Sequence, residues 1–394
     1  MKSKILFCFA TAFAILQSLT AQGQLPVIRA ASDQVDIREG KEFYPGQWTI
    51  VPEARPDVYT TSVVGESVTF YTDKDSISFR IEKGGVYDFV ILLNGKDSAF
   101  TQIKYVPSHL DILKGAAVYN YKDHTDIPEF YYQDSSAAEL KTLRQALNLD
   151  SIAGQGTEIL KIINLMHWIH DLIPHDGNHE NPVVKNAMSM IRECKAGNRG
   201  LNCRGLATVL NECYLALGIK SRFVTCMPKD SVFDDCHVIN MVYSTELNKW
   251  VWMDPTNDAY IMDENGVLLG LEEVRERVIN GKTVILNPDA NWNNRSTTTK
   301  DYYLLEYMAK NLYRLECPVR SEYDYETRLD GKKFEYVELL PLDGYRQTPK
   351  ISERKYQNPG VTFKTYKTNN PDQFWVLPGE KKREKDTGSK GDSK

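Results

Sequence analysis

Three side chains in the middle of the chain belong to the types that carry out nucleophilic catalysis together. Cys203 offers a thiol, His237 an imidazole and Asp254 a carboxylate. A cysteine attacks a carbonyl carbon as its thiolate, an imidazole takes and returns the proton, and a carboxylate holds the imidazole in its productive orientation. These residues therefore predict acyl transfer from an amide through a thioester.

Cys203 is expected in the first turn of a helix that spans residues 203–217. Asn202 is a preferred N-cap residue, and apolar side chains such as Leu206 and Leu210 recur at helical spacing. The start of a helix stabilises negative charge, which lowers the pKa of a thiol placed there. The competing interpretation is a small buried cysteine without a chemical role.

His237 and Asp254 are expected on two adjacent antiparallel strands joined by the polar segment 244–249. If Tyr243 pairs with Trp250, the histidine and the aspartate lie diagonally across the two strands. A shift of one residue on each strand would place them directly opposite. In either register both side chains lie on the same face of the sheet, so the imidazole and the carboxylate meet.

This part of the chain resembles the transglutaminase-like superfamily. Residues 202–224, with the sequence NCRGLATVLNECYLALGIKSRFV, are similar to its nucleophile helix and the strand that follows. His237 at the start of a strand and the sequence WMDPT at 252–256 resemble its other two motifs. The resemblance covers roughly residues 155–260 and implies a papain-like α+β core. Members of the superfamily include cross-linking transglutaminases, peptide N-glycanases and bacterial cysteine peptidases.

The resemblance also implies a role for each of the three side chains. Cys203 would be the nucleophile, His237 the general base and acid, and Asp254 the group that orients the imidazole. Family members often carry an aromatic residue after the histidine, whereas Val238 follows it here. This departure concerns the substrate groove rather than the reacting groups. The resemblance implies no cofactor.

Two groups are candidates for stabilising the oxyanion that forms when a thiolate attacks a carbonyl. The backbone N–H of Cys203 is one, because an amide in the first turn of a helix has no partner within that helix. The indole N–H of Trp168, on a predicted helix over residues 157–172, is the other. The competing interpretation of Trp168 is an aromatic side chain in the core.

Four histidines follow one another closely in the sequence, at His167, His170, His175 and His179. His167 and His170 are placed to face one metal ion from a helix, but no HExxH spacing occurs and Pro174 separates the two pairs. We therefore predict no metal site and expect the loop 174–181 to border the active-site cleft. The segment 254–266 is rich in Asp and Asn but lacks the EF-hand spacing, so a calcium site has no support.

The pattern of elements predicts an α+β protein with a separate β-rich front. Period-two alternation and hairpin signals such as Asn94-Gly95 indicate a small all-β, sandwich-like domain over residues 24–115. Residues 130–378 are expected to form one catalytic domain, with helices on an antiparallel sheet that the segment after residue 280 completes. Its predicted helices span 137–147, 157–172, 183–193, 203–217 and 271–280, and its predicted strands span 222–226, 237–243, 250–253 and 361–366.

The two ends of the sequence differ from the rest in composition. Lys2 and Lys4 precede an apolar stretch and then small polar residues, which is typical of a cleaved secretory signal peptide over residues 1–23. Cys8 lies inside the apolar stretch, which argues against a lipoprotein. The signal pattern and the family resemblance together imply an exported bacterial protein, periplasmic or secreted. Residues 379–394 lack large apolar side chains and are expected to be disordered.

Composition limits the classes of partner. The 394 residues are 42% hydrophobic and carry a formal net charge of -5, which is typical of a globular protein and gives no electrostatic reason to bind nucleic acid. No later apolar run reaches the roughly 18 residues that span a bilayer. Six of the seven cysteines follow the expected signal peptide, but a reactive Cys203 would leave room for two disulfides at most.

Three functions from different classes fit these features. The first is an exported thiol-dependent hydrolase that cleaves peptide or side-chain amide bonds. The second is a protein-glutamine gamma-glutamyltransferase that cross-links side chains, and the third is a catalytically silent binding module. The expected partner is a peptide, protein or muropeptide substrate, and the oligomeric state stays open. The presence of all three of Cys203, His237 and Asp254 favours an enzyme.

Overall fold

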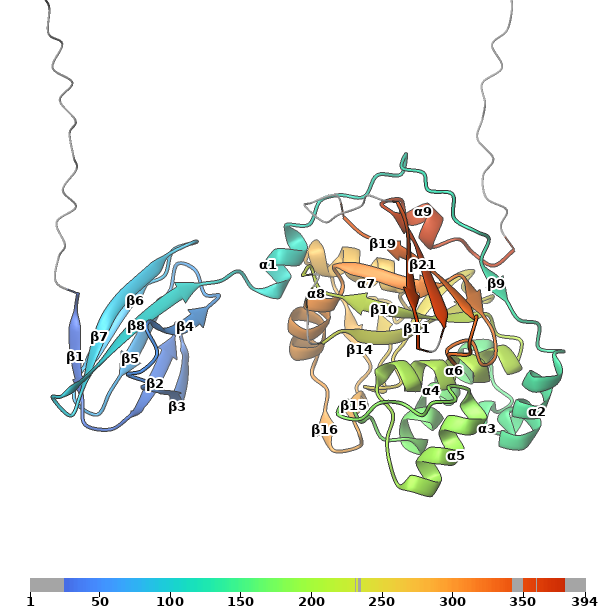
Figure 1. Ribbon diagram of the computed structural model, residues 1–394, viewed down its shortest axis with the longest axis horizontal. Coiled ribbons are helices and arrows are strands. Elements are labelled where there is room, and N and C mark those ends of the chain that lie inside the picture. Colours follow the sequence, from blue (N-terminus) through green and yellow to red (C-terminus); the bar gives the residue numbers. More distant parts are fainter. Residues whose placement is uncertain (1–24, 231, 233–234, 342–349, 359, 380–394) are drawn as a thin grey trace, which may run out of the picture. The chain divides into compact units, whose positions relative to one another are not determined.

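The computed structural model describes residues 25–230, 232, 235–341, 350–358 and 360–379. The expected signal peptide, and all but the first residue of the expected disordered tail, lie outside these ranges. The chain forms two compact units, the first ending at Pro107 and the second beginning at Ser108 (Figure 1). Within the described residues, no helix combines the length and apolar character that a bilayer span requires.

The first unit is made of two four-stranded sheets that share one core. Its strands are β1 Val27–Ala30, β2 Gln34–Glu39, β3 Glu42–Thr49, β4 Asp57–Thr61, β5 Ser67–Tyr71, β6 Ser76–Arg80, β7 Val86–Leu93 and β8 Asp97–Tyr105. The sheet orders are β1-β7-β8-β4 and β3-β2-β5-β6. Alternate side chains of each sheet point inward, so that Ile37 and Phe70 of one sheet belong to the same core as Phe89 and Ile91 of the other. The predicted small sandwich is confirmed.

The boundary between the two units lies between Pro107 and Ser108, earlier than the predicted end of the first domain at residue 115. Helix α1, His109–Lys114, belongs to the second unit because its Leu113 is buried in the core of that unit. Ser108 caps this helix by accepting a hydrogen bond from the backbone N–H of Asp111. The six-residue helix is too short for its apolar spacing to be visible in the sequence.

The second unit is built around a seven-stranded sheet with the order β12-β11-β10-β17-β19-β21-β20. These strands are β10 Ser221–Met227, β11 His237–Ser244, β12 Lys249–Met253, β17 Arg314–Pro318, β19 Lys333–Leu339, β20 Ile351–Tyr356 and β21 Val361–Thr368. All neighbours are antiparallel except β19 and β21. The last four strands extend the sheet directly from β10, so the segment after residue 280 completes the core, as expected.

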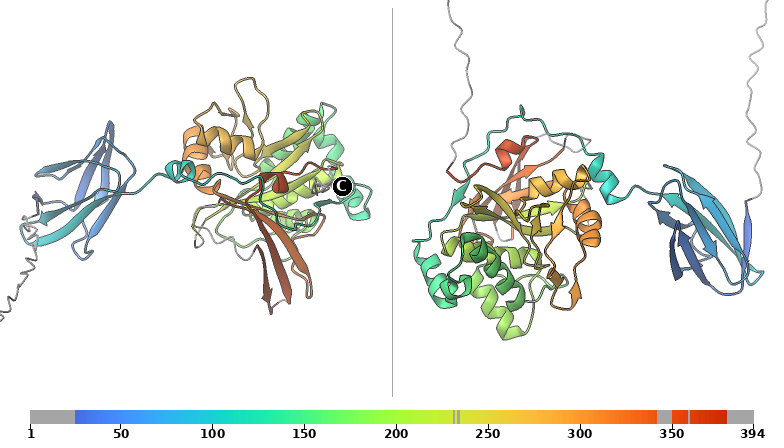
Figure 2. Two further views of the ribbon diagram at one scale, coloured as in Figure 1. Left: turned by 90° about the horizontal axis from the view of Figure 1, so that it is seen from above. Right: turned by 180° about the vertical axis from the view of Figure 1, so that it is seen from behind.

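Helices cover one face of β10, β11 and β12, and gather on that side of the sheet (Figure 2). They are α2 Ala138–Leu147, α3 Leu149–Ala153, α4 Glu158–Leu172, α5 Ala187–Gly197 and α6 Cys203–Ala216. Every residue of α6 from Gly205 to Ala216 is buried, which fits a central helix that packs on all sides. The predicted α+β class, with helices on an antiparallel sheet, is confirmed.

The opposite face of the same strands is covered by later segments of the chain. They include α7 Leu271–Ile279, the π-helix η1 Asp301–Tyr307 and α8 Met308–Asn311, with α9 Pro371–Phe374 near the chain end. Short two-stranded pairs join β9 Tyr131–Tyr132 to β18 Arg320–Ser321, β13 Ile261–Met262 to β14 Ile285–Leu286, and β15 Asn291–Trp292 to β16 Ser296–Thr297. Hairpin β15–β16 and helix η1 both contribute side chains to the site described below.

Candidate active site

The carboxylate of Asp254 and the imidazole of His237 form a buried hydrogen-bonded pair. His237 Nε2 lies 2.7 Å from Asp254 Oδ2, and neither side chain is exposed beyond 1%. The strand register pairs Tyr243 with Trp250, which is the first of the two registers considered from the sequence. Both side chains therefore lie on one face of the sheet, diagonally across β11 and the end of β12.

Further groups fix the orientation of the Asp254 carboxylate. Its Oδ2 also accepts hydrogen bonds from the Tyr303 hydroxyl and from Asn257 Nδ2, and its Oδ1 accepts one from the backbone N–H of Thr256 at 2.9 Å. Burial by itself would raise the pKa of Asp254, but the charge of His237 and these hydrogen bonds keep the pKa below its ordinary value. The carboxylate is thus held ionised and in place.

Cys203 is the first residue of α6, and Asn202 is its N-cap, as predicted. The Asn202 side chain accepts a hydrogen bond from the backbone N–H of Gly205. The half-buried Cys203 thiol is hydrogen-bonded to the side chains of His237 and His175. The structure therefore brings Cys203, His237 and Asp254 together in the order sulfur, imidazole, carboxylate.

Electrostatics at Cys203 favour the thiolate. Burial opposes ionisation of the thiol, but the hydrogen bonds of His175 and His237 and the positive charge of His237 outweigh it and lower the pKa of Cys203 to about 6. Burial also opposes protonation of His237, yet the charge and hydrogen bond of Asp254, with Cys203, raise the pKa of His237 to about 10. At pH values between about 6 and about 10, Cys203 and His237 therefore exist as thiolate and imidazolium.

The second nitrogen of His237 faces the reacting side of the site. Because Nε2 is bound to Asp254, Nδ1 is the atom left to exchange a proton with Cys203 or a substrate. The hydroxyl of Tyr307, from helix η1, lies 3.4 Å from Nδ1, and the two rings meet edge to face with centroids 5.3 Å apart. Tyr307 and Tyr303 escaped the sequence analysis because nothing in the Tyr-rich segment 300–378 links it to the three reacting residues.

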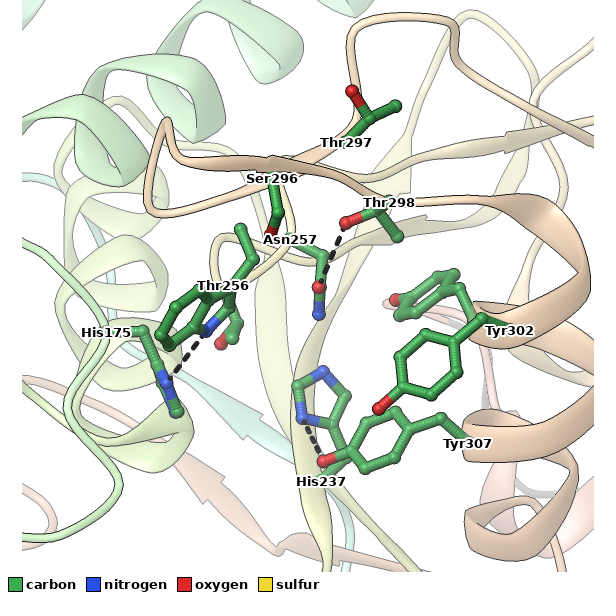
Figure 3. A pocket seen from close by; sticks show the side chains of 11 residues that line it. His175, His237, Thr256, Asn257, Ser296, Thr297, Thr298, Tyr302 and Tyr307 are labelled. Carbon is green, nitrogen blue, oxygen red and sulfur yellow. Dashed lines mark hydrogen bonds between the residues drawn. The ribbon is translucent and has the colours of Figure 1, made fainter. Parts of the chain in front are cut away.

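A cavity of about 370 Å³ opens beside His237. Figure 3 shows His237 within it, His175 to one side, and Tyr302 and Tyr307 to the other. Its lining joins two imidazoles to aromatic, hydroxyl and amide side chains, contributed by His175, His237, Thr256, Asn257, Trp292, Ser296, Thr297, Thr298, Tyr302, Tyr303 and Tyr307. Among these lining residues there is no carboxylate, lysine or arginine. The cavity suits an uncharged polar group.

Two of the loop histidines singled out in the sequence have clear places near this cavity. His175 lines it, so the loop 174–181 does border the candidate site. His179 is largely exposed and binds Asp176, with Nδ1 to Oδ2 at 2.7 Å. Trp168, the sequence candidate for the oxyanion donor, packs against the hydrophobic core between the helices and is not among the cavity residues. It occupies the position of a core aromatic, the competing interpretation.

The two histidines of helix α4 do not converge on a common point. His170 is buried, with Nδ1 bound to the carbonyl of Pro255 and Nε2 to Asn291 Oδ1. His167 Nδ1 lies 2.6 Å from Asp258 Oδ1, and the Asp258 hydrogen bond raises the pKa of His167 despite burial. In the described part of the chain, His167, Asp258 and Asp289 are close enough to share a metal ion. The short His167–Asp258 contact already satisfies both groups as a protein hydrogen bond.

The other cysteines are poor nucleophiles. All six cysteines that the structure describes are free thiols, at Cys194, Cys203, Cys213, Cys226, Cys236 and Cys317. Cys236, which immediately precedes His237, is half-buried, and burial raises its pKa to about 11. Burial likewise raises the pKa of Cys317 to about 11. Only Cys203 combines partial exposure with a lowered pKa among these six.

Comparisons with known proteins agree with the family resemblance. Residues 145–255 match the model of the transglutaminase-like superfamily, which confirms a transglutaminase-like core in the region where the three motifs predicted it. The match covers the helices α3 to α6 and the strands β10 to β12, including all of Cys203, His237 and Asp254. No curated protein matches the chain.

Two solved structures overlap with parts of the chain. One is the Putative Cysteine Protease from Cytophaga hutchinsonii, with 19% identity over 36% of this chain and 44% of that chain, at a TM-score of 0.25. The other is red sea bream transglutaminase, with 12% identity over 63% of this chain and 51% of that chain, at a TM-score of 0.21. The chain therefore spans about half the length of each, or less.

Proposed function

We propose that this chain, whose residues 145–255 form a transglutaminase-like core, is a thiol-dependent hydrolase of peptide or side-chain amide bonds. The observation that carries the proposal is the arrangement at Cys203. Its sulfur is hydrogen-bonded to His237, and His237 is held by the buried carboxylate of Asp254. A thiolate, an oriented imidazole and a cavity beside them are the parts that acyl transfer requires.

The steps follow from the positions of these groups. The Cys203 thiolate attacks the amide carbonyl carbon, and the carbonyl electron pair moves to oxygen. The tetrahedral intermediate collapses, the C–N bond breaks, and His237 Nδ1–H gives its proton to the leaving amine. Water then attacks the thioester while His237 takes its proton, and the carboxylic acid and the Cys203 thiolate are released. Asp254 keeps the imidazole oriented throughout.

The pattern of residues 1–23 adds export to the proposal, so substrates outside the cytoplasm are the ones to test. The absence of carboxylates, lysines and arginines among the lining residues supports a neutral acyl group next to the scissile bond. Peptides, protein side-chain amides and muropeptide cross-links all contain such groups.

The test compares hydrolysis by the wild type and by Cys203→Ala on a mixed pool of peptides and muropeptides. We expect new products with the wild type and none with Cys203→Ala. Cys236→Ala is the matched control, because this neighbouring thiol has a raised pKa and should leave the products unchanged. Loss of products with Cys236→Ala, or products from Cys203→Ala, would refute the assignment of the nucleophile.

A labelled primary amine in the same reaction separates hydrolysis from cross-linking. Both reactions share the thioester and differ only in whether water or an amine resolves it. The proposal predicts free acids and little incorporated label. If a glutamine-containing peptide gains the label in preference to losing its amide to water, the protein is instead a transferase.

A further inference from the structure

We infer that His175 is the second oxyanion donor of this site and directs its Nε2–H at the carbonyl oxygen of the bound acyl group. The inference rests on the proposed function, because an oxyanion forms only if Cys203 attacks a carbonyl. The first donor is the backbone N–H of Cys203, which has no partner within its own helix. Trp168, the donor considered from the sequence, packs against the core between the helices, so the second donor must be another group.

His175 is placed at the sulfur but is not needed as the base. Its side chain is hydrogen-bonded to Cys203, and it lines the cavity together with His237. His237 already combines a carboxylate partner on Nε2 with an Nδ1 that can exchange a proton with Cys203. Within the described residues, His175 is the other imidazole at the sulfur, and its further side-chain partner is the Trp292 indole rather than a carboxylate.

The hydrogen bond from Trp292 determines which nitrogen of His175 carries the proton. The indole Nε1–H of Trp292 donates to Nδ1 of His175 over 3.3 Å. Nδ1 must therefore be the unprotonated acceptor, and in a neutral imidazole the proton is then on Nε2. His175 thus offers an N–H donor from Nε2, the atom left to face the sulfur and an attacked carbonyl.

The backbone of His175 is held rigidly, as an oxyanion donor requires. Asn293 Oδ1 accepts a hydrogen bond from the backbone N–H of His175 at 2.6 Å, and Asn293 Nδ2 donates to the His175 carbonyl at 2.9 Å. On its other side His175 forms a parallel bridge with Leu201. The neighbouring Asp176 N–H donates to the Leu201 carbonyl at 2.7 Å.

The bridge to Leu201 also sets the position of His175 relative to the nucleophile. Leu201 stands two residues before Cys203, so the segment that carries the imidazole runs beside the segment that leads into α6. Gly200 makes this approach possible, because a Cβ there would lie 2.2 Å from the carbonyl oxygen of Pro174. The loop and the helix start are therefore one rigid unit.

In the reaction, His175 donates a hydrogen bond and keeps its proton. The C–S bond forms from the thiolate pair, the carbonyl π pair moves to oxygen, and His175 Nε2–H and Cys203 N–H hold the resulting negative charge. When the pair returns to reform the carbonyl, the C–N bond breaks and the proton for the amine comes from His237. No oxidant or further reactant is needed.

The test compares two reactions of Cys203, of which only one creates an oxyanion. Acylation by p-nitrophenyl acetate passes through a tetrahedral oxyanion, whereas alkylation by iodoacetamide does not. For His175→Ala, we expect the acylation rate at its alkaline plateau to fall by about 10²–10³-fold. The alkylation rate at its plateau should stay within about twofold of the wild type, and an unchanged circular dichroism spectrum shows that the variant is folded. The alkylation midpoint should move to higher pH.

Two further variants keep the result specific. His175→Gln retains an N–H donor and should recover part of the lost acylation, because its amide can occupy the same side of the cavity. His179→Ala removes an exposed histidine from the same loop and is expected to behave as the wild type. Four other ionisable groups interact electrostatically with Cys203, namely His237, Tyr307, Cys226 and Cys236. Variants are therefore compared at the same pH and at the plateau of each rate, where the ionisation of Cys203 is complete.

The outcomes separate this inference from the proposed function. If the wild type is acylated and His175→Ala is acylated equally fast, or His175→Gln is as slow as His175→Ala, His175 is not an oxyanion donor and the proposed function stands. If the wild type is acylated no faster than Cys203→Ala, the proposed function and the inference both fail.

Discussion

At the scale of single residues, the charge state of Cys203 is decided by its neighbours rather than by its exposure. Burial alone would favour a neutral thiol, and two imidazoles reverse that preference. His237 in turn depends on Asp254 for its positive charge. The ionisation of Cys203 therefore depends on His237, and through His237 on the buried carboxylate of Asp254.

The pH dependence of Cys203 alkylation should reveal the influence of His237 and Asp254 on the thiol. In the wild type we expect the rate with iodoacetamide to rise with a midpoint near pH 6, well below the about 8.5 of an ordinary cysteine. Asp254→Asn removes the charge that keeps His237 protonated. In this variant the alkylation midpoint of Cys203 should therefore move to higher pH. Mass spectrometry identifies the alkylated residue. A wild-type midpoint at the ordinary value, or label mainly on another cysteine, would contradict the thiolate assignment.

Tyr303 should contribute to stability through Asp254. Tyr303→Phe keeps the buried ring but removes a hydrogen bond to a charged oxygen, so we expect a loss of about 2 kcal/mol in the free energy of unfolding. Urea denaturation measures this change. Tyr302→Phe is the control, since its side chain is 60% exposed and the change should stay within about 0.5 kcal/mol. Equal stability of both variants would show that the Tyr303–Asp254 bond has no net value.

The three residues of the candidate site were predictable because each stands at a recognisable position of an element. Cys203 follows a good N-cap, His237 starts a strand, and Asp254 ends the next one. His175 and Trp292 were not predictable as partners. His175 lies on a loop and Trp292 on the two-residue strand β15, neither long enough to show a period, and only the folded chain brings these residues, 117 apart in sequence, together.

At the scale of elements, the site depends on where a helix and two strands begin and end. The structure places the start of α6 at the predicted residue and the β11–β12 register at Tyr243 and Trp250. The apolar periodicity of residues 203–217 predicted the helix, and the polar segment 244–249 predicted the hairpin that sets the register. Helix η1 was not predicted, because its π-helical turn does not follow the ordinary helical spacing.

A substitution at Gly200 tests whether the close approach of the loop 174–176 to the segment before α6 is needed for stability and reactivity. Gly200→Ala would force a Cβ against the backbone of Pro174, so we expect a loss of about 1–3 kcal/mol in stability and slower acylation of Cys203. Gly197→Ala is the matched control, because its Cβ would meet only the Arg199 side chain at ordinary contact distance. Thermal unfolding and p-nitrophenyl acetate kinetics report the two effects. If both variants match the wild type, the close approach at Gly200 is not important.

At the scale of the whole molecule, the chain divides into a β-sandwich unit and an α+β unit, each with its own core. The strand pattern predicted the β-rich front, but the boundary between the two units lies between strand β8 and helix α1 rather than after α1. Every residue assigned to the site belongs to the second unit. Within the described residues, the two large cores of that unit contain no residue before Ser108.

The second unit should therefore be active alone. We expect a fragment of residues 108–394 to fold cooperatively and to show the same alkylation midpoint for Cys203 as the full chain. Circular dichroism and the iodoacetamide profile check the two statements. A fragment that stays unfolded, or whose midpoint moves toward that of an ordinary thiol, would show that the first unit is part of the catalytic machinery.

The central claim is that Cys203 carries an acyl group during turnover, and intact-mass analysis tests it most directly. The protein is mixed with p-nitrophenyl acetate near neutral pH, quenched in acid and digested for mapping. The account predicts one acetyl group on Cys203, released by neutral hydroxylamine as a thioester would be, and no such adduct in Cys203→Ala. An unmodified wild type, or an acetyl group that maps to another residue and resists hydroxylamine, would contradict it.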